Sequence, residues 1–211
     1  MGFFSSLFSK SEQPIRQLNH AQDLIVGDMI DLDDSFALPA QLKGQQFKVE
    51  AVNTYEYEHS KTTEWQLKGV NDQAIFLTLD QDDEVQLAFS IKITRAQVEQ
   101  LFDMEQFSQI FEETDDASLT ISADQPFKQF SQWLGKEYHQ NIFAQFGYFH
   151  HKDLRSVKDI TDQGEEVESY QLTDITEKYA IDIDVYAGGE TEVNLVMYRP
   201  ETDIREFWPV S

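Results

Sequence analysis

Apolar side chains recur at every second position in several stretches of this 211-residue chain. The clearest stretches are 47–57, 65–67, 75–79, 85–93, 167–175, 179–187, 191–199 and 204–208. Successive side chains of a strand point to opposite faces of a sheet, so this alternation predicts antiparallel strands with one apolar face and one polar face. The aromatic stretch 138–149 adds a further extended segment.

Two parts of the chain also resemble each other. The matches are WQL at 65–67 with YQL at 170–172 (offset 105), 74–79 with 180–185 (offset 106) and 84–87 with 192–195 (offset 108). Small slips of the offset at turns are what variation in loop length would produce. The matches predict an internal duplication in which Trp65 and Tyr170 occupy equivalent half-buried sites. The alternative is that alternating β sequences resemble one another by construction.

Two hairpins are expected to share one loop rule. The apolar residues of both strands in each hairpin have odd sequence numbers. They can lie opposite one another only if the loop between the strands contains an odd number of residues. For the second hairpin the simplest loop is 187–189, with Gly189 free to adopt a positive φ. For the first hairpin the loop falls within 80–84, an acidic run that tolerates turn conformations.

The middle of the chain changes to helical spacing. Thr94 followed by Gln97 predicts a capping box, and the apolar residues after it recur at intervals of three and four. We therefore expect an α+β fold, predominantly antiparallel β, with two β-rich lobes joined by a mostly helical segment. The expected parts are an N-terminal arm (1–20), a first β lobe (21–93), a helical bridge (94–135) and a second β lobe (136–211).

The charge of the chain excludes one class of partner. Asp and Glu number 39 against 16 Lys and Arg, which gives a net charge of −23. Nucleic-acid binding depends on neutralising phosphates with Lys and Arg, so no DNA or RNA partner is expected. The acidity serves solubility, or it forms a docking surface for a basic protein partner or a mimic of nucleic acid.

The expected location is cytoplasmic. The sequence contains no cysteine, which excludes disulfides and thiolate chemistry and fits a reducing compartment. It also has no apolar run of the roughly 20 residues that a membrane-spanning helix needs.

The N-terminal arm carries a small apolar cluster. If this segment is helical, Phe3, Phe4, Leu7 and Phe8 share one face. Such a short amphipathic segment could contact a bilayer interface at the periphery of the inner membrane or a groove on a protein partner. The alternatives are a frayed terminus or packing on its own domain.

No catalytic, cofactor-binding or metal-binding residue stands out. His150 and His151 are adjacent, so on a regular strand they point to opposite faces and cannot ligate one metal ion. The run 80–84 begins like a calcium loop but lacks its Gly and Glu, and Asp182 and Asp184 are interpreted as a solvated strand face. Phosphate-binding and nucleophile motifs are missing, so no enzyme activity and no cofactor are expected.

One stretch resembles a known group of proteins. It comprises Gly27-Asp28 after an apolar run, Phe47-x-Val49, Tyr55 and Trp65-x-Leu67, and it covers roughly residues 23–93. The pattern is similar to that of small uncharacterised bacterial β-rich domains of unknown function whose genes lie near homologues of phage-shock protein A. The second half matches more loosely, with Tyr170 in place of the Trp. The resemblance implies a bacterial accessory protein of a membrane-stress system.

Three functional hypotheses follow. The first is a non-enzymatic interaction or adaptor protein with an unidentified protein partner, in a membrane-stress or envelope-linked system. The second is a small-ligand-binding module whose pocket lies between the β lobes, lined by Phe143, Phe146, Tyr148 and Phe149. The third is a carboxylate-dependent hydrolase. A deep pocket with convergent polar groups would favour ligand binding, whereas a filled interior would favour the adaptor.

Overall fold

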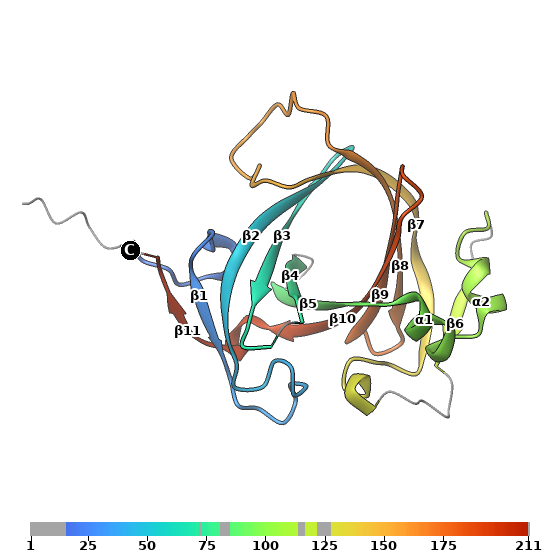
Figure 1. Cartoon of the computed structure of the whole chain (residues 1–211), viewed down its shortest axis with the longest axis horizontal. Helices are drawn as coiled ribbons and strands as arrows, with labels where there is room; N and C mark the ends of the chain where they lie inside the picture. The colour runs from blue at the N-terminus through green and yellow to red at the C-terminus, as the bar shows by residue number, and fades with distance from the viewer. Residues whose placement is uncertain (1–15, 72, 81–84, 114–116, 122–127, 211) are drawn as a thin grey trace, which may run out of the picture.

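The computed structural model describes residues 16–71, 73–80, 85–113, 117–121 and 128–210. Within them the strands form a single antiparallel sheet with the order β11-β1-β2-β3-β4-β5-β10-β9-β8-β7-β6 (Figure 1). The strands are β1 (Met29–Leu32), β2 (Gln46–Tyr57), β3 (Lys61–Lys68), β4 (Ile75–Asp80), β5 (Gln86–Ile93), β6 (Ser118–Thr120), β7 (Glu137–His150), β8 (Glu165–Asp174), β9 (Tyr179–Tyr186), β10 (Thr191–Pro200) and β11 (Ile204–Trp208).

Helices are short and lie at the periphery. Two α-helices, α1 (Arg95–Leu101) and α2 (Met104–Gln109), lie to one side of β7 and β8 in Figure 1. The described residues also include three short 3-10 helices: η1 (Ala21–Asp23), η2 (Lys128–Phe130) and η3 (Glu201–Asp203). No helix among the described residues is both long and apolar enough to cross a membrane.

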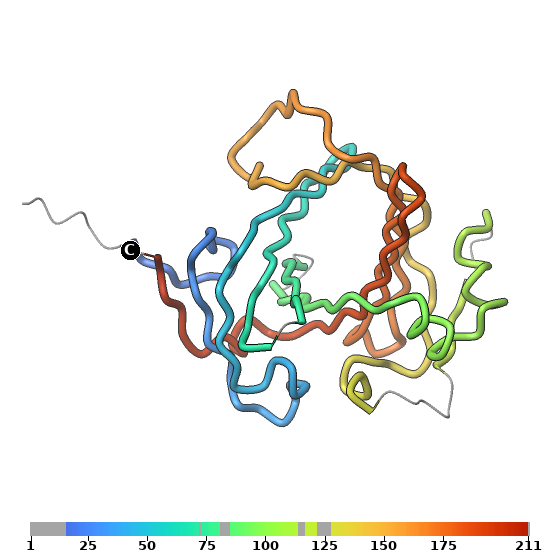
Figure 2. The backbone as a smooth tube through the Cα atoms, in the orientation of Figure 1, coloured from blue at the N-terminus to red at the C-terminus, as the bar shows by residue number. Residues whose placement is uncertain are grey.

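The sheet closes on itself because β2 also pairs with β7. The pairing is antiparallel and joins the C-terminal ends of the two strands, from Thr54 opposite His150 to Tyr57 opposite Gly147. Gly147 suits this close approach, because a Cβ there would lie 2.7 Å from the carbonyl oxygen of Glu56 and from the ring of Tyr57. The result is a closed ring of eight strands, β2-β3-β4-β5-β10-β9-β8-β7, which the backbone trace in Figure 2 follows.

Apart from β11, which pairs with β1 at one edge, the strand order is symmetric about the β5–β10 pairing. Strands β1 to β5 lie on one side of the β5–β10 pairing, and β6 to β10 lie on the other side in the mirrored order. The closing pair also joins strands that hold the same place in each half, β2 and β7. Trp65 on β3 lies opposite Leu77 on β4, as Tyr170 on β8 lies opposite Ile183 on β9.

Both hairpins follow the expected loop rule. In the second, Ile183 lies opposite Val193, and the loop 187–189 has Gly189 at φ +84°. In the first, Leu79 lies opposite Leu87, although the loop itself falls outside the described residues. The capping box at Thr94 and Gln97 is also present at the start of α1.

The main hydrophobic core covers the outer face of the ring. Its strand residues are the apolar members of the alternation, such as Trp65, Leu77, Phe89, Ile181 and Leu195. These side chains are at most 1% exposed. Packed against them are residues from outside the ring, among them Leu24, Leu42, Val98, Phe107 and Trp133.

The expected division into two β lobes needs revision in one respect. The strands of the two halves do not form separate sheets, because β5 and β10 pair over eight residue positions. The middle segment also contributes a strand, β6, beside its two short helices. Predominantly antiparallel β is confirmed as the fold class; the helical content is too small and too peripheral for helices to form a layer of their own.

Candidate functional site: a polar cavity inside the closed sheet

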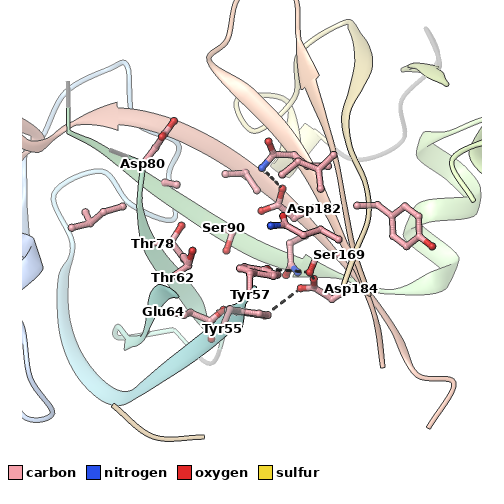
Figure 3. A pocket seen from close by; sticks show the side chains of 18 of the residues that line it. Tyr55, Tyr57, Thr62, Glu64, Thr78, Asp80, Ser90, Ser169, Asp182 and Asp184 are labelled. Carbon is pink, nitrogen blue, oxygen red and sulfur yellow. Dashed lines mark hydrogen bonds between the residues drawn. The ribbon is translucent and has the colours of Figure 1, made fainter. Parts of the chain in front are cut away.

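The inner face of the ring encloses a cavity of about 310 Å³. All eight ring strands contribute side chains to its wall, which is possible only for the face that points inward. Figure 3 shows Tyr55, Glu64, Thr78, Ser90 and Asp182 among the side chains that converge there. Ser60 and Asp80 also line the cavity and are exposed, so they mark its opening to solvent.

Three carboxyl groups are held on this wall by neutral hydrogen-bond donors. Asn53 Nδ2 donates to Glu64 Oε1 over 2.9 Å, and Gln171 Nε2 donates to Asp182 Oδ1 over 2.9 Å. The second oxygens of Glu64 and Asp182 accept no hydrogen bond from the described residues. These two oxygens are therefore available to a ligand.

Asp184 is bound more completely than the other two. Ser169 Oγ donates to its Oδ1 over 2.6 Å, and the Tyr55 hydroxyl donates to its Oδ2 over 3.2 Å. Because Tyr55 belongs to β2 and Asp184 to β9, this hydrogen bond spans the interior (dashed line in Figure 3). Tyr57, also on β2, makes a second such link to Ser169 on β8 over 3.1 Å.

Burial makes these carboxyl groups hard to ionise. Desolvation raises the pKa of Glu64 to about 7, although the hydrogen bond from Asn53 opposes the shift. Desolvation likewise raises the pKa of Asp182 to about 7, against the hydrogen bond from Gln171. The pKa of Asp184 is raised for the same reason, and the bonds from Ser169 and Tyr55 oppose it. Because desolvation disfavours the ionised form, Glu64 and Asp182 exist near neutral pH as mixtures of protonated and ionised groups, whereas ordinary carboxyl groups are ionised there.

A second, smaller space lies on the same inner face. It measures about 280 Å³ and shares Tyr55, Glu64 and Asn194 with the first cavity. These three side chains therefore form the wall between the two spaces. The second space contains a basic group, since Lys92 pairs there with Glu192.

The aromatic residues expected to line a pocket mostly lie elsewhere. Phe143 and Phe146 are 42% and 50% exposed, and Tyr148 packs against Phe146 at 5.3 Å between ring centroids. Of the four, Phe149 alone lines one of the two spaces, where its ring contacts Tyr55 at 4.8 Å. The prediction of an aromatic pocket was wrong because a bulge in β7 at 142–145 and the strand alternation turn the other three rings outward.

The other residues singled out in the sequence lie away from the cavity of about 310 Å³ or outside the described residues. Phe3, Phe4, Leu7 and Phe8 lie outside the described residues. His150 is buried and its Nε2 lies 3.0 Å from Glu56 Oε2, whereas His151 is exposed. No group of three or more His, Asp or Glu side chains suited to a metal ion occurs among the residues the structure describes.

The interpretation of Asp182 and Asp184 as a solvated strand face was wrong. Asp184 is 7% exposed, and both carboxyl groups face the interior of the ring. The only related signal in the sequence was the alternation between strongly apolar and polar residues on these strands in both halves of the chain. Alternation defines two faces, but it does not state which face is enclosed.

Comparisons with known proteins add no identity. No family model, no curated protein and no solved structure matches this chain.

Proposed function

We propose that this protein binds a small polar molecule inside the closed sheet. The observation that carries the proposal is the cavity of about 310 Å³ with polar groups from all eight ring strands on its wall. Ligand sites are concave, with a few polar groups placed by a rigid scaffold, and the interior of a closed sheet is a common location for them. The Asn53, Gln171 and Ser169 hydrogen bonds hold the carboxyl groups in defined positions.

The composition of the wall supports binding over a purely structural interior. Ionisable groups with raised pKa values, gathered in a cavity, are typical of functional sites. Apolar residues of similar size at Glu64, Asp182 and Asp184 would fill the interior without the cost of desolvating carboxyl groups. Retention of three such groups is therefore easier to explain by a ligand than by stability.

An internal duplication is the second part of the proposal. The mirrored strand order, the matching hairpin parity and the equivalent places of Trp65 and Tyr170 support it. Under this proposal each half contributes four adjacent strands to the ring, so a complete cavity requires both copies. Trp65 and Tyr170 were expected to be half-buried, but they are almost fully buried, at 1% and 6% exposure.

The binding proposal is tested by blocking the cavity. Ser90 on β5 lines it, and a Ser90→Phe substitution would fill part of the space. Amide NMR spectra of the wild type and this variant are recorded with 1,4-diaminobutane, 1,4-butanediol, succinate and glucose in turn. We expect at least one compound to shift resonances of cavity-lining residues in the wild type and not in the variant. A panel that shifts none of these resonances contradicts the proposal.

An adaptor role is the second candidate, favoured by one surface feature. On the outer side of β8, Phe111 and Phe143 pack edge-on against Tyr170 at 5.1 and 5.6 Å, and they are 38% and 42% exposed. Exposed aromatic clusters of this kind mark protein contacts. Affinity capture with the wild type and a Phe143→Ser variant tests this role: a partner lost only by the variant supports it, and equal capture by both contradicts it. The membrane-stress setting stays a prediction from the sequence resemblance.

A further inference from the structure

The charge of the cavity wall is one-sided. Its described lining contains four carboxyl groups, from Glu64, Asp80, Asp182 and Asp184, and no Lys, Arg or His. An anionic ligand would oppose the ionisation of all four carboxyl groups, and the described lining offers it no cationic side chain. A neutral ligand would leave the free oxygens of Glu64 and Asp182 with hydrogen-bond donors but no charge partner. A cationic ligand with N–H groups donates hydrogen bonds to both free oxygens and also supplies the charge partner that the ionised carboxylates lack.

The four carboxyl groups are divided between two depths. At the inner end, the pKa of Glu64 is raised chiefly by burial and further by nearby Asp184. Nearer the opening, Asp182 and Asp80 both act on the hydroxyl of Tyr198, whose pKa is raised chiefly by burial. Asp182 and Asp184 are two positions apart on β9, which places their Cα atoms about 7 Å apart at the usual rise of a strand. A ligand with two cationic groups joined by a short alkyl chain matches this spacing.

The remainder of the wall suits an alkyl chain between two charged ends. Apolar side chains of Leu79, Ala88 and Val196 lie among the polar ones, and the rings of Tyr57 and Tyr198 can contact either methylene groups or a cationic head. Side-chain oxygens in the cavity can accept the three N–H groups of an ammonium ion. A bare divalent metal ion is disfavoured, since the described residues offer no cluster of three ligands.

From this geometry we infer that the ligand is a linear organic di- or polycation, an alkyl diamine or polyamine, with its ammonium groups at Glu64–Asp184 and at Asp182–Asp80. The inference rests on the proposed binding function and specifies the ligand class of the same cavity. The inference also predicts proton release on binding, which attraction of the amine to surface carboxylates would not produce. An entering ammonium group favours the ionised carboxylate, so binding displaces protons held by Glu64 and Asp182.

The experiment is isothermal titration calorimetry of the full chain with 1,4-diaminobutane and with spermidine at pH 6.5. It is repeated in two buffers of different ionisation enthalpy, so that proton release is measured directly. Succinate and 1,4-butanediol serve as anionic and neutral probes of similar length, and Mg²⁺ serves as an inorganic dication. Glu64→Gln and Asp182→Asn remove one charge each while keeping an oxygen that accepts from Asn53 or Gln171. Glu58→Gln, on a side chain that is 86% exposed, is the matched surface control.

The expected result is diamine or polyamine binding with proton release. The affinity should fall about tenfold or more in Glu64→Gln and Asp182→Asn, which is about 1.4 kcal/mol, and stay within about twofold in Glu58→Gln. Binding that the two cavity variants leave unchanged would show attraction to the acidic surface alone and overturn the inference. Tighter binding of Mg²⁺ than of either amine, lost in the same variants, would overturn it in favour of a metal site.

Failure of the ligand class and failure of the binding function give different results. If succinate or 1,4-butanediol binds, Ser90→Phe abolishes that binding and the amines do not bind, the cation inference falls but the cavity remains a binding site. If none of the probes binds to the wild type, both proposals fall. Thermal unfolding of each variant confirms that it is folded before the titrations are compared.

Discussion

The two faces of the closed sheet differ in what they touch. Along β9, Ile181 and Ile183 point outward and are fully buried beneath peripheral segments, whereas Asp182 and Asp184 point inward to a cavity. The usual arrangement of a small closed sheet, an apolar interior and a polar exterior, is reversed here. The outer face therefore carries most of the hydrophobic stabilisation, and the inner face is left free for polar chemistry.

This difference explains the role of the peripheral segments. An apolar outer face must be covered, and the segments before β1, between β1 and β2 and between β5 and β7 supply the cover with residues such as Leu24, Leu42 and Trp133. The loop between β7 and β8 adds hydrogen bonds, including Arg155 Nη2 to the carbonyl oxygen of Leu24 over 2.8 Å. Substitutions on the two faces should consequently have very different effects on stability.

The largest effect is expected at Trp65 on the outer face. Its side chain is 1% exposed, its Nε1 donates to the carbonyl oxygen of Leu24 over 2.9 Å, and the Arg155 guanidinium lies 5.4 Å from the ring. We expect Trp65→Ala to reduce the free energy of unfolding by about 3–5 kcal/mol in urea denaturation. Its inner-face neighbour in the same strand provides the control, Gln66→Ala, which should cost less than about 1 kcal/mol. Equal losses in the two variants would contradict the assignment of the faces.

A second matched pair lies on β4. Leu77 is fully buried on the outer face, and Thr78 lines the cavity. Leu77→Ala should reduce the free energy of unfolding by about 2–4 kcal/mol because it leaves a void in the core. Thr78→Ala enlarges a space that already exists, so we expect a change below about 1 kcal/mol in the same denaturation series. A loss of several kcal/mol for Thr78→Ala would show that the inner face is packed.

The inner face should also make stability depend on pH. The pKa values of Glu64 and Asp182 are about 7 in the folded chain, against 4.5 and 3.8 ordinarily, because burial disfavours the ionised forms. Between pH of about 4 and 7 the folded state therefore binds more protons than the unfolded state, and stability decreases as pH rises through this range. We expect the Tm at pH 8 to lie about 5 °C or more below that at pH 5. A Tm that rises steadily from pH 5 to pH 8 would contradict the burial of these carboxyl groups.

The amide variants should remove part of that dependence. Glu64→Gln and Asp182→Asn take away a group that is costly to ionise, so each should raise the free energy of unfolding at pH 8 by about 1–2 kcal/mol. At pH 4, where the native carboxyl groups hold their protons, the same substitutions should have little effect. Urea denaturation at both pH values measures the difference, and an exposed control, Glu112→Gln, should show no such contrast. Destabilisation at pH 8 would indicate that the carboxylates are charged and satisfied in the folded chain.

Much of the fold could be predicted from local patterns. Period-two alternation identified the strands and their faces, and parity alone gave the register of Ile183 against Val193 and the three-residue loop with Gly189. The capping box at Thr94 was equally local. These features depend on neighbouring residues or on one hairpin, so a single sequence contains the information.

The closed ring and its cavity could not be predicted in this way. Closure depends on Thr54–Tyr57 meeting Gly147–His150, segments about ninety residues apart with no turn to connect them. Without closure, polar positions such as Glu64 and Asp182 look like a solvated face, because alternation gives the same pattern whether the polar side faces water or an enclosed space. The bulge in β7 at 142–145, which turns Phe143 and Phe146 outward, was equally absent from the alternation pattern.

The most direct test of the polar interior is a pH titration followed by NMR of the side-chain carboxyl carbons, without ligand and then with 1,4-diaminobutane. The resonances of Glu64 and Asp182 should titrate near pH 7, and the amine should move them and lower their apparent pKa values. Titration of both groups in the ordinary range of Asp and Glu, with no change when the amine is added, would show that these side chains face open solvent and would contradict a buried binding cavity inside the ring.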